Sequence, residues 1–140
     1  MESVNVAQPV QLSRMGVPIG RALLGALFVV SGLLKIGRFA GVAAALESTG
    51  LPMPQALAAA VIVFEVLAGL ALALGWRTKV SAALLALFVV AATLLFHRFW
   101  AADAAAYGNQ LNHFLKNIAL TGALLMLACA EQADRVAPRT

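Results

Sequence analysis

Residues 80–96 read VSAALLALFVVAATLLF and contain no charged side chain over seventeen positions. Lys79 precedes this stretch and His97 follows it. A hydrocarbon core of about 30 Å needs about 20 residues of helix, and a terminal lysine lengthens an apolar run by placing its ammonium group at the interface. The polar and apolar residues do not alternate as they do in a β-barrel strand. We therefore predict a transmembrane helix over residues 80–97.

Three other segments have the same Ala- and Leu-rich character, namely residues 19–36, 55–76 and 111–130. Hydrophobic residues make up 62% of the chain and Asp, Glu, Lys and Arg only 11%, whereas soluble domains have about 25% charged residues. We predict an all-α, polytopic membrane protein, an antiparallel four-helix transmembrane bundle. The whole chain, residues 1–140, forms this single domain, with polar tails at residues 1–16 and 131–140.

The net charge of +4 does not indicate nucleic-acid binding. Such binding needs a solvated basic patch, and the ten basic residues here are scattered singly or in pairs at the edges of apolar runs. Helix flanks carry basic residues in this way in membrane proteins. We therefore predict contact with a lipid bilayer and none with nucleic acid.

The connections between the four segments differ in length. Only residues 75–79 separate the second and third segments, which predicts an antiparallel hairpin. In the loop after the first segment, Phe39, Val42, Ala43 and Leu46 have the spacing of one helix face. We predict a short interfacial helix there.

Glu65 is the most informative polar residue, because it lies near the middle of its segment. A charged group at that depth costs on the order of 2.5–3.5 kcal/mol on insertion scales unless it is paired. The cations on neighbouring segments are Lys35, Lys116 and Arg21. Two interpretations remain open: an ion pair that locks the bundle, or a carboxylate that contacts a ligand or handles protons.

Histidines and an asparagine mark the third and fourth segments. His97 and His113 are expected at the same membrane edge, and Asn117 lies one turn from His113. Interfacial hydrogen bonding is the simpler interpretation of the two histidines, and ligation of haem or a metal by His97 and His113 is the alternative. The sequence contains no cofactor-binding motif, so no metal site is predicted from any other residues.

A series of motifs along residues 19–127 resembles the DoxX family of small four-helix bacterial membrane proteins. The motifs are RALLGALFVVSGLLK (residues 21–35), GLP (50–52), FEVLAG (64–69), GWRT (75–78), FHRF (96–99) and FLKNIALTG (114–122). The polar positions that match the family pattern are Arg21, Lys35, Glu65, His97, Lys116 and Asn117. His113 is not part of that pattern.

The resemblance implies an inner-membrane subunit of a redox system, or of one linked to thiol or oxidative stress, with membrane or periplasmic redox partner proteins. A quinone-like or other small amphipathic ligand is expected in the bundle, beside the six polar positions. Two other functions remain open: a non-catalytic scaffold that docks partner proteins, and a small-molecule carrier that would need to form a homo-oligomer. Whether the protein is an enzyme also stays open.

Lys and Arg counts predict the orientation. With the N-terminus in the cytoplasm, six basic residues lie inside and four outside, the bias of the positive-inside rule. We therefore predict a bacterial inner-membrane protein with both termini in the cytoplasm.

Reporter fusions test this orientation. A reporter after Thr140 or in the turn of residues 77–79 is expected in the cytoplasm, and one in residues 101–108 outside. Alkaline phosphatase and green fluorescent protein activities of the fusions measure the side. The orientation is wrong if the two loop reporters exchange sides.

Overall fold

The computed structural model describes the backbone of residues 7–136 and the side chains of residues 15–130. Within these residues the chain is helical and contains no strand. The elements are α1 (Ala7–Ile36), α2 (Phe39–Ser48), α3 (Pro54–Leu74), α4 (Thr78–Phe96), the 3-10 turn η1 (Phe99–Ala101) and α5 (Ala104–Val136). Four helices are long and apolar enough to span a membrane. The predicted all-α, polytopic fold class is therefore confirmed, and α2 is the short helix expected in the first long connection.

The first and last helices are longer than the apolar segments. Helix α1 begins at Ala7, inside the expected polar tail of residues 1–16, and α5 runs from Ala104 to Val136 instead of beginning near residue 111. An apolar run measures only the part of a helix that lies in hydrocarbon, whereas polar residues continue a helix in water or at the interface. The expected tails are thus partly helical, and residues 1–6 and 137–140 lie outside the described part of the chain.

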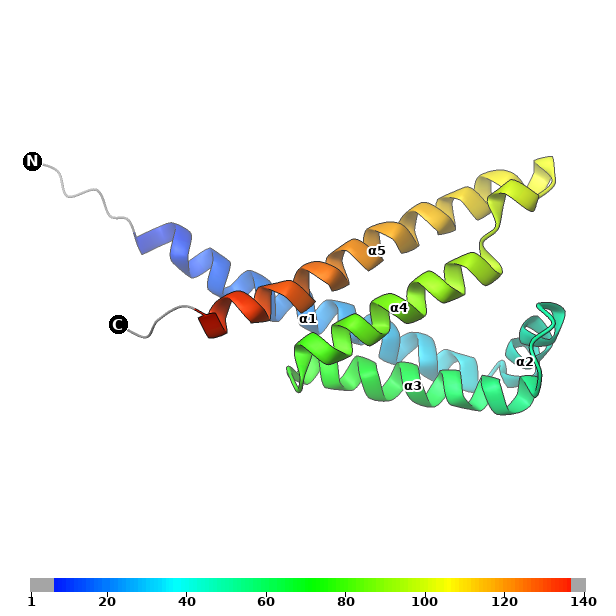
Figure 1. Ribbon diagram of the computed structural model, residues 1–140, viewed down its shortest axis with the longest axis horizontal. Coiled ribbons are helices and arrows are strands. Elements are labelled where there is room, and N and C mark those ends of the chain that lie inside the picture. The colour runs from blue at the N-terminus through cyan, green and yellow to red at the C-terminus, as the bar shows by residue number, and fades with distance from the viewer. Residues whose placement is uncertain (1–6, 137–140) are drawn as a thin grey trace, which may run out of the picture.

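The helices pack in a chain of neighbours. Helix α1 packs along α3, α3 packs on α4, and α4 packs along α5, while α1 and α5 touch only slightly. The start of α1, the end of α5 and the α3–α4 turn lie at one end of the molecule, called here the turn end (Figure 1). Helix α2, which packs on α3, and η1 lie at the opposite end, called here the α2 end.

A glycine ends α3 and allows the tight turn into α4. Gly75 has φ 77°, in the left-handed region that glycine enters without steric cost. The backbone N–H of Trp76 then donates to the carbonyl of Ala71 at 2.8 Å, which satisfies an acceptor that the helix end leaves free. The chain reverses within three residues, as the short connection predicts.

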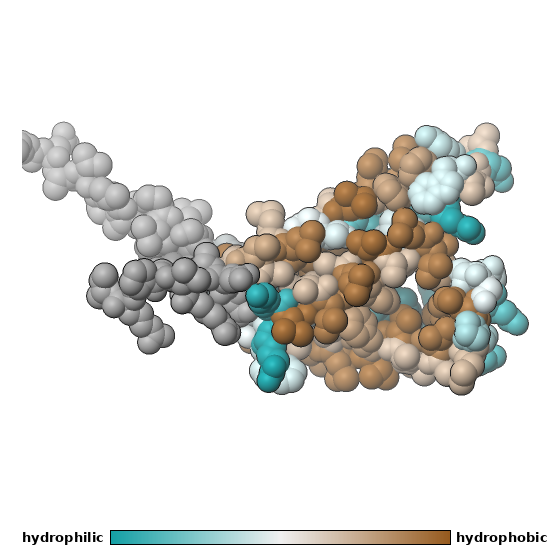
Figure 2. Space-filling view, viewed as in Figure 1, coloured by the Kyte–Doolittle hydropathy of each residue, from teal (hydrophilic) through white to brown (hydrophobic). Residues whose placement is uncertain are grey.

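Apolar side chains form both the core and the outer surface. Phe28, Leu72, Leu85, Val89 and Leu124 pack together in the interior. Many large apolar side chains are nevertheless exposed, including Leu23, Leu34, Leu67, Leu87 and Met126. Figure 2 shows apolar residues over the middle of the visible face, with hydrophilic residues gathered mostly toward its ends. This distribution fits a molecule whose helices are covered by lipid rather than water.

Glycines bring α1 and α3 into close contact. A Cβ added at Gly25 would lie 2.5 Å from the carbonyl oxygen of Gly69, and one at Gly69 would lie 2.9 Å from the carbonyl oxygen of Gly25. A Cβ at Gly32 would lie 3.3 Å from Cβ of Glu65. Small residues allow such approach between membrane helices, where van der Waals packing drives association. The seam of Gly25, Gly32 and Gly69 therefore sets the distance at which Glu65 faces α1.

Replacing Gly25 by Ala tests this seam. The new methyl group would meet backbone atoms of α3, which cannot move aside alone, so we expect a loss of about 1–3 kcal/mol in the free energy of unfolding. Gly122→Ala is the matched control, because nothing lies within 4 Å of its added Cβ. Unfolding in mild detergent, followed by circular dichroism, compares the two. Equal stability of both variants would contradict the close crossing.

Candidate functional site

A buried ion pair joins α1 to α3. Lys35 Nζ donates to Glu65 Oε1 at 3.0 Å and to Oε2 at 2.8 Å. The Glu65 side chain is 4% exposed and the Lys35 side chain 30%. The apolar stem of Lys35 therefore passes along α1 while its ammonium group reaches inward to the carboxylate.

Ser31 completes this arrangement one turn before Lys35 on α1. Its hydroxyl donates to Glu65 Oε1 at 3.4 Å and accepts from Lys35 Nζ at 2.6 Å. Both carboxylate oxygens and the ammonium group thus have partners, which a buried charge requires. Ser31 was not among the predicted site residues. Its position four residues before Lys35 places it on the same helix face, which is the signal that could have identified it.

A second polar contact joins α4 to α5 across the interior. Asn117 Nδ2 donates to Thr93 Oγ1 at 2.9 Å, and the Thr93 hydroxyl donates to the carbonyl of Val89 at 2.6 Å. Thr93 is 1% exposed. The contact fixes Asn117 on the inner face of α5, opposite the α1–α3 pair.

A cavity of about 200 Å³ lies between these two polar contacts; we call it the core cavity. Its polar lining consists of Ser31, Lys35, Glu65, His97 and Asn117, and its apolar lining includes Phe28, Phe88 and Leu120. Side chains from α1, α3, α4 and α5 therefore converge on one space, although α1 and α5 hardly touch. The space combines donors, a carboxylate and aromatic surface, the combination typical of ligand sites in helix bundles.

His97 lies at the α2 end of the core cavity, where α4 ends. Its Nδ1 is 3.2 Å from Gln110 Oε1. Because an amide oxygen only accepts, Nδ1 carries the proton in this contact when the ring is neutral, and Nε2 is then the basic nitrogen. His113 stacks on His97 with ring centroids 4.9 Å apart and an angle of 11° between the rings.

The stacked histidines present ring faces to one another rather than nitrogen lone pairs, which an iron or zinc ion between them would need. No group of three or more His, Cys, Asp or Glu residues suited to a metal occurs in the described part of the chain. The described geometry thus shows a hydrogen bond to Gln110 for His97 and ring stacking for His113.

Two of the six expected site residues lie away from the core cavity. Lys116 is exposed on α5, because it is one position, or about 100° of helix rotation, from the inward-facing Asn117. Arg21 lies at the turn end, where its guanidinium group contacts Gly75 so closely that a Cβ there would clash. A cation at this point complements the partial negative charge at the C-terminus of α3. The expectation that both residues share a site with Glu65 is not met by this geometry.

These features define the class of the protein: an all-α membrane protein with an ion pair and a cavity between its spanning helices. A family model described as DoxX matches residues 16–98, which include Lys35, Glu65 and His97. The chain therefore belongs to the DoxX family. No solved structure matches it.

Two relatives from Escherichia coli strain K12 cover most of the chain. Inner membrane protein YphA is 31% identical over 110 residues, which is 79% of each protein. Inner membrane protein YqjF is 33% identical over 118 residues, or 84% of this chain and 85% of the relative. The similarity thus extends over nearly the whole bundle.

The ion pair is tested by removing each partner and both. Lys35→Met leaves the Glu65 carboxylate buried without its cation, and we expect a loss of about 3 kcal/mol in the free energy of unfolding. Glu65→Gln keeps the shape and part of the hydrogen bonding, so it costs less. The double variant recovers most of the loss, because no unpaired charge remains. Unfolding in mild detergent gives the coupling between the two sites, and strictly additive effects would contradict the pair.

Proposed function

We propose that the protein is an inner-membrane subunit of a redox or thiol- and oxidative-stress-linked system, and that its core cavity binds a quinone-like or similar amphipathic ring. The observation that carries the proposal is the core cavity itself, with an ion pair on one wall and aromatic and aliphatic side chains on the other. The family membership and the names of the two relatives support the inner-membrane location.

The size of the core cavity suits a single ring. An apolar cavity of about 150 Å³ in another protein accommodates benzene, and the volume here is about 200 Å³. A quinone ring has apolar faces, which Phe28 and Phe88 match, and carbonyl oxygens that accept hydrogen bonds. The available donor for these oxygens is the Asn117 amide, which keeps one N–H beyond the one that it donates to Thr93. The three N–H groups of Lys35 already donate to Glu65 and Ser31.

The chain would supply protons and orientation, and not electrons. Reduction of a quinone to a quinol takes two electrons and two protons. His97 is the candidate for proton exchange with the ring, since its hydrogen bond to Gln110 leaves Nε2 as the nitrogen free to take up or release a proton. The electrons would come from, or pass to, a partner protein of the same system.

The outer face of α5 favours a second function, that of a scaffold for partner proteins. The spanning part of α5 is Ala104–Ala130. In its most apolar stretch of 18 residues, 11% of the residues are buried in the bundle, compared with 33% in the corresponding stretches of α3 and α4. A helix with so little of its surface in contact with its own bundle can bind a partner helix or a second copy of the chain. On this alternative the core cavity stays empty in the working complex.

Substituting His97 by Phe distinguishes the two functions. The change keeps the aromatic bulk and removes the proton-exchanging nitrogen. We expect binding of a short-chain ubiquinone in its reduced form, whose hydroxyl can donate to Nε2 of His97, to weaken by about tenfold, or about 1.4 kcal/mol. This is the scale of one hydrogen bond, and equilibrium dialysis in mild detergent measures it.

Two variants control for structural damage. His113→Phe changes the stacked ring outside the core cavity, and Gln110→Leu removes the hydrogen-bond partner of His97 without changing the cavity wall. Both are expected to bind the quinone more tightly than His97→Phe does. Unchanged binding in a folded His97→Phe protein, or no binding by the wild-type chain, would contradict the ligand site and favour the scaffold.

A further inference from the structure

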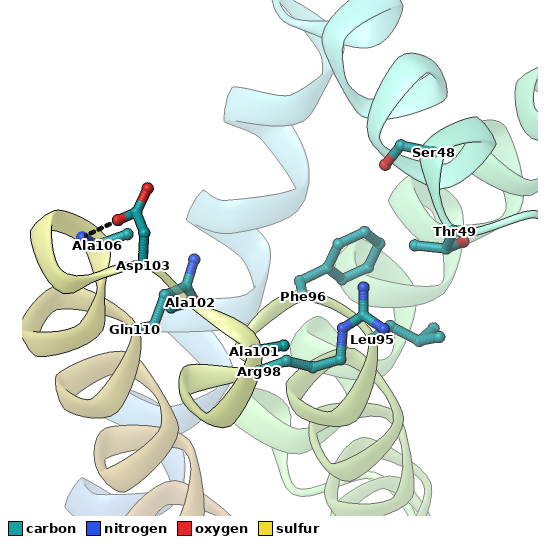
Figure 3. Close-up of a pocket in the computed structure, with 10 residues that line it drawn as sticks. All are labelled: Ser48, Thr49, Leu95, Phe96, Arg98, Ala101, Ala102, Asp103, Ala106 and Gln110. Atoms are coloured by element: carbon teal, nitrogen blue, oxygen red, sulfur yellow. Dashed lines mark hydrogen bonds between the residues drawn. The ribbon is translucent and has the colours of Figure 1, made fainter.

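A second and larger pocket lies at the α2 end, with a volume of about 410 Å³ (Figure 3); we call it the α2-end pocket. One wall is the end of α2, and the other is the segment that joins α4 to α5. The polar side chains that line it are Ser48, Thr49, Arg98, Asp103 and Gln110. It shares no lining residue with the core cavity.

Three of these polar side chains have part of their hydrogen-bonding capacity already in use. The hydroxyls of Ser48 and Thr49 donate to the carbonyls of Ala45 and Leu46, at 2.7 and 2.6 Å. Gln110 Oε1 is held by His97 at 3.2 Å, which leaves the amide N–H₂ of Gln110 as a free donor. The two hydroxyls can therefore only accept, and Gln110 can still donate.

Arg98 is the main unused donor in the α2-end pocket. Its guanidinium group forms no hydrogen bond or ion pair with any residue whose side chain is described. A guanidinium group has five N–H donors in a planar fork that matches a carboxylate or phosphate group. Figure 3 shows Arg98 and Gln110 extending into the pocket from one wall, with Ser48 and Thr49 on the other.

Asp103 gives the same pocket a negative side. One carboxylate oxygen, Oδ1, accepts from the backbone N–H of Ala106 at 2.8 Å and so caps α5. The other oxygen, Oδ2, has no hydrogen-bond partner among the described side chains and points away from the helix (Figure 3). Asp103 and Arg98 line one space without forming an ion pair with each other, since Lys35–Glu65 is the one salt bridge found among the described side chains.

We propose that the α2-end pocket binds a small zwitterionic group, with its phosphate or carboxylate on Arg98 and Gln110 and its ammonium on Asp103. A ligand with both charges satisfies both side chains, whereas a simple anion would meet the repulsion of the Asp103 carboxylate. This inference is independent of the ligand proposed for the core cavity.

The position of the pocket identifies the phosphoethanolamine headgroup of a membrane lipid as the nearest source of such a group. Arg98 lies two residues after the end of the apolar helix α4, at the level where hydrocarbon ends. Trp100 and Tyr107, next to the pocket, are both exposed, and such residues collect at the headgroup level of a bilayer. A free small zwitterion is the other source of the same chemistry.

Native mass spectrometry of the full chain in mild detergent tests the proposal with two lipids, dioleoyl phosphatidylethanolamine and dioleoyl phosphatidylglycerol. The wild-type protein is expected to retain the first in preference to the second. Arg98→Gln is expected to weaken retention of phosphatidylethanolamine by about tenfold or more, the scale of a lost hydrogen bond to a charged group.

Asp103→Asn is the sharper variant. Asparagine also caps a helix, so α5 is preserved while the negative charge is lost. The preference for phosphatidylethanolamine is then expected to disappear, because phosphatidylglycerol no longer meets a like charge. Arg77→Gln is the control, since Arg77 is an exposed arginine at the turn end, and it is expected to leave lipid retention unchanged.

Free O-phosphoethanolamine distinguishes the two sources. Release of the lipid by millimolar amounts of this compound supports recognition of the charged group alone, and retention of the lipid in its presence supports a lipid ligand. The proposal is overturned if Arg98→Gln and Asp103→Asn, both folded by circular dichroism, retain the two lipids as the wild type does. It is equally overturned if Arg77→Gln has the same effect as Arg98→Gln.

Discussion

The buried carboxylate of Glu65 is the constraint on which the arrangement of the helices depends. An ionised group at this depth costs several kcal/mol unless a cation lies beside it, and Lys35 is the cation that reaches it. The reach of a lysine side chain requires α1 and α3 to cross closely. Gly25, Gly32 and Gly69 permit that crossing, so the ion pair and the glycine seam depend on each other.

The same constraint leaves room for a ligand. With α1 held against α3 and α4 held against α5, the two helix pairs meet mainly through α3 and α4. A space that neither helix pair fills then remains between them. Lys35 and Glu65 line one side of this space and Asn117 lines the other. A fully satisfied polar network normally closes the interior of a bundle. Here each half of the polar interior is satisfied within its own helix pair, and the core cavity remains between them.

The sequence was sufficient for the helices and for part of the site. Length and charge predicted four spans. The depth of Glu65 left two interpretations open, an ion pair with a neighbouring cation or a carboxylate that contacts a ligand or handles protons. Which of Lys35, Lys116 and Arg21 pairs with Glu65 depends on how each helix is rotated about its axis. The family pattern gives the order of the residues but not this rotation. Spacing alone places Lys116 outward once Asn117 is known to face inward. The α2-end pocket could not be predicted, because loop segments that are distant in sequence form it.

The unusual length of α5 connects the buried site to the membrane edge. Its spanning part, Ala104–Ala130, has 27 residues, about seven more than a bilayer core requires. The excess lies at the α2 end, where Asn109, Gln110 and Asn112 are polar, so the first two turns of α5 stand at the headgroup level. Lys116 then lies close enough to the interface for its ammonium group to reach water, which explains how this exposed lysine is tolerated without an ion-pair partner among the described side chains. Asp103 caps these turns and Gln110 lies within them. Through the contact between Gln110 and His97 they hold the edge of the core cavity in place.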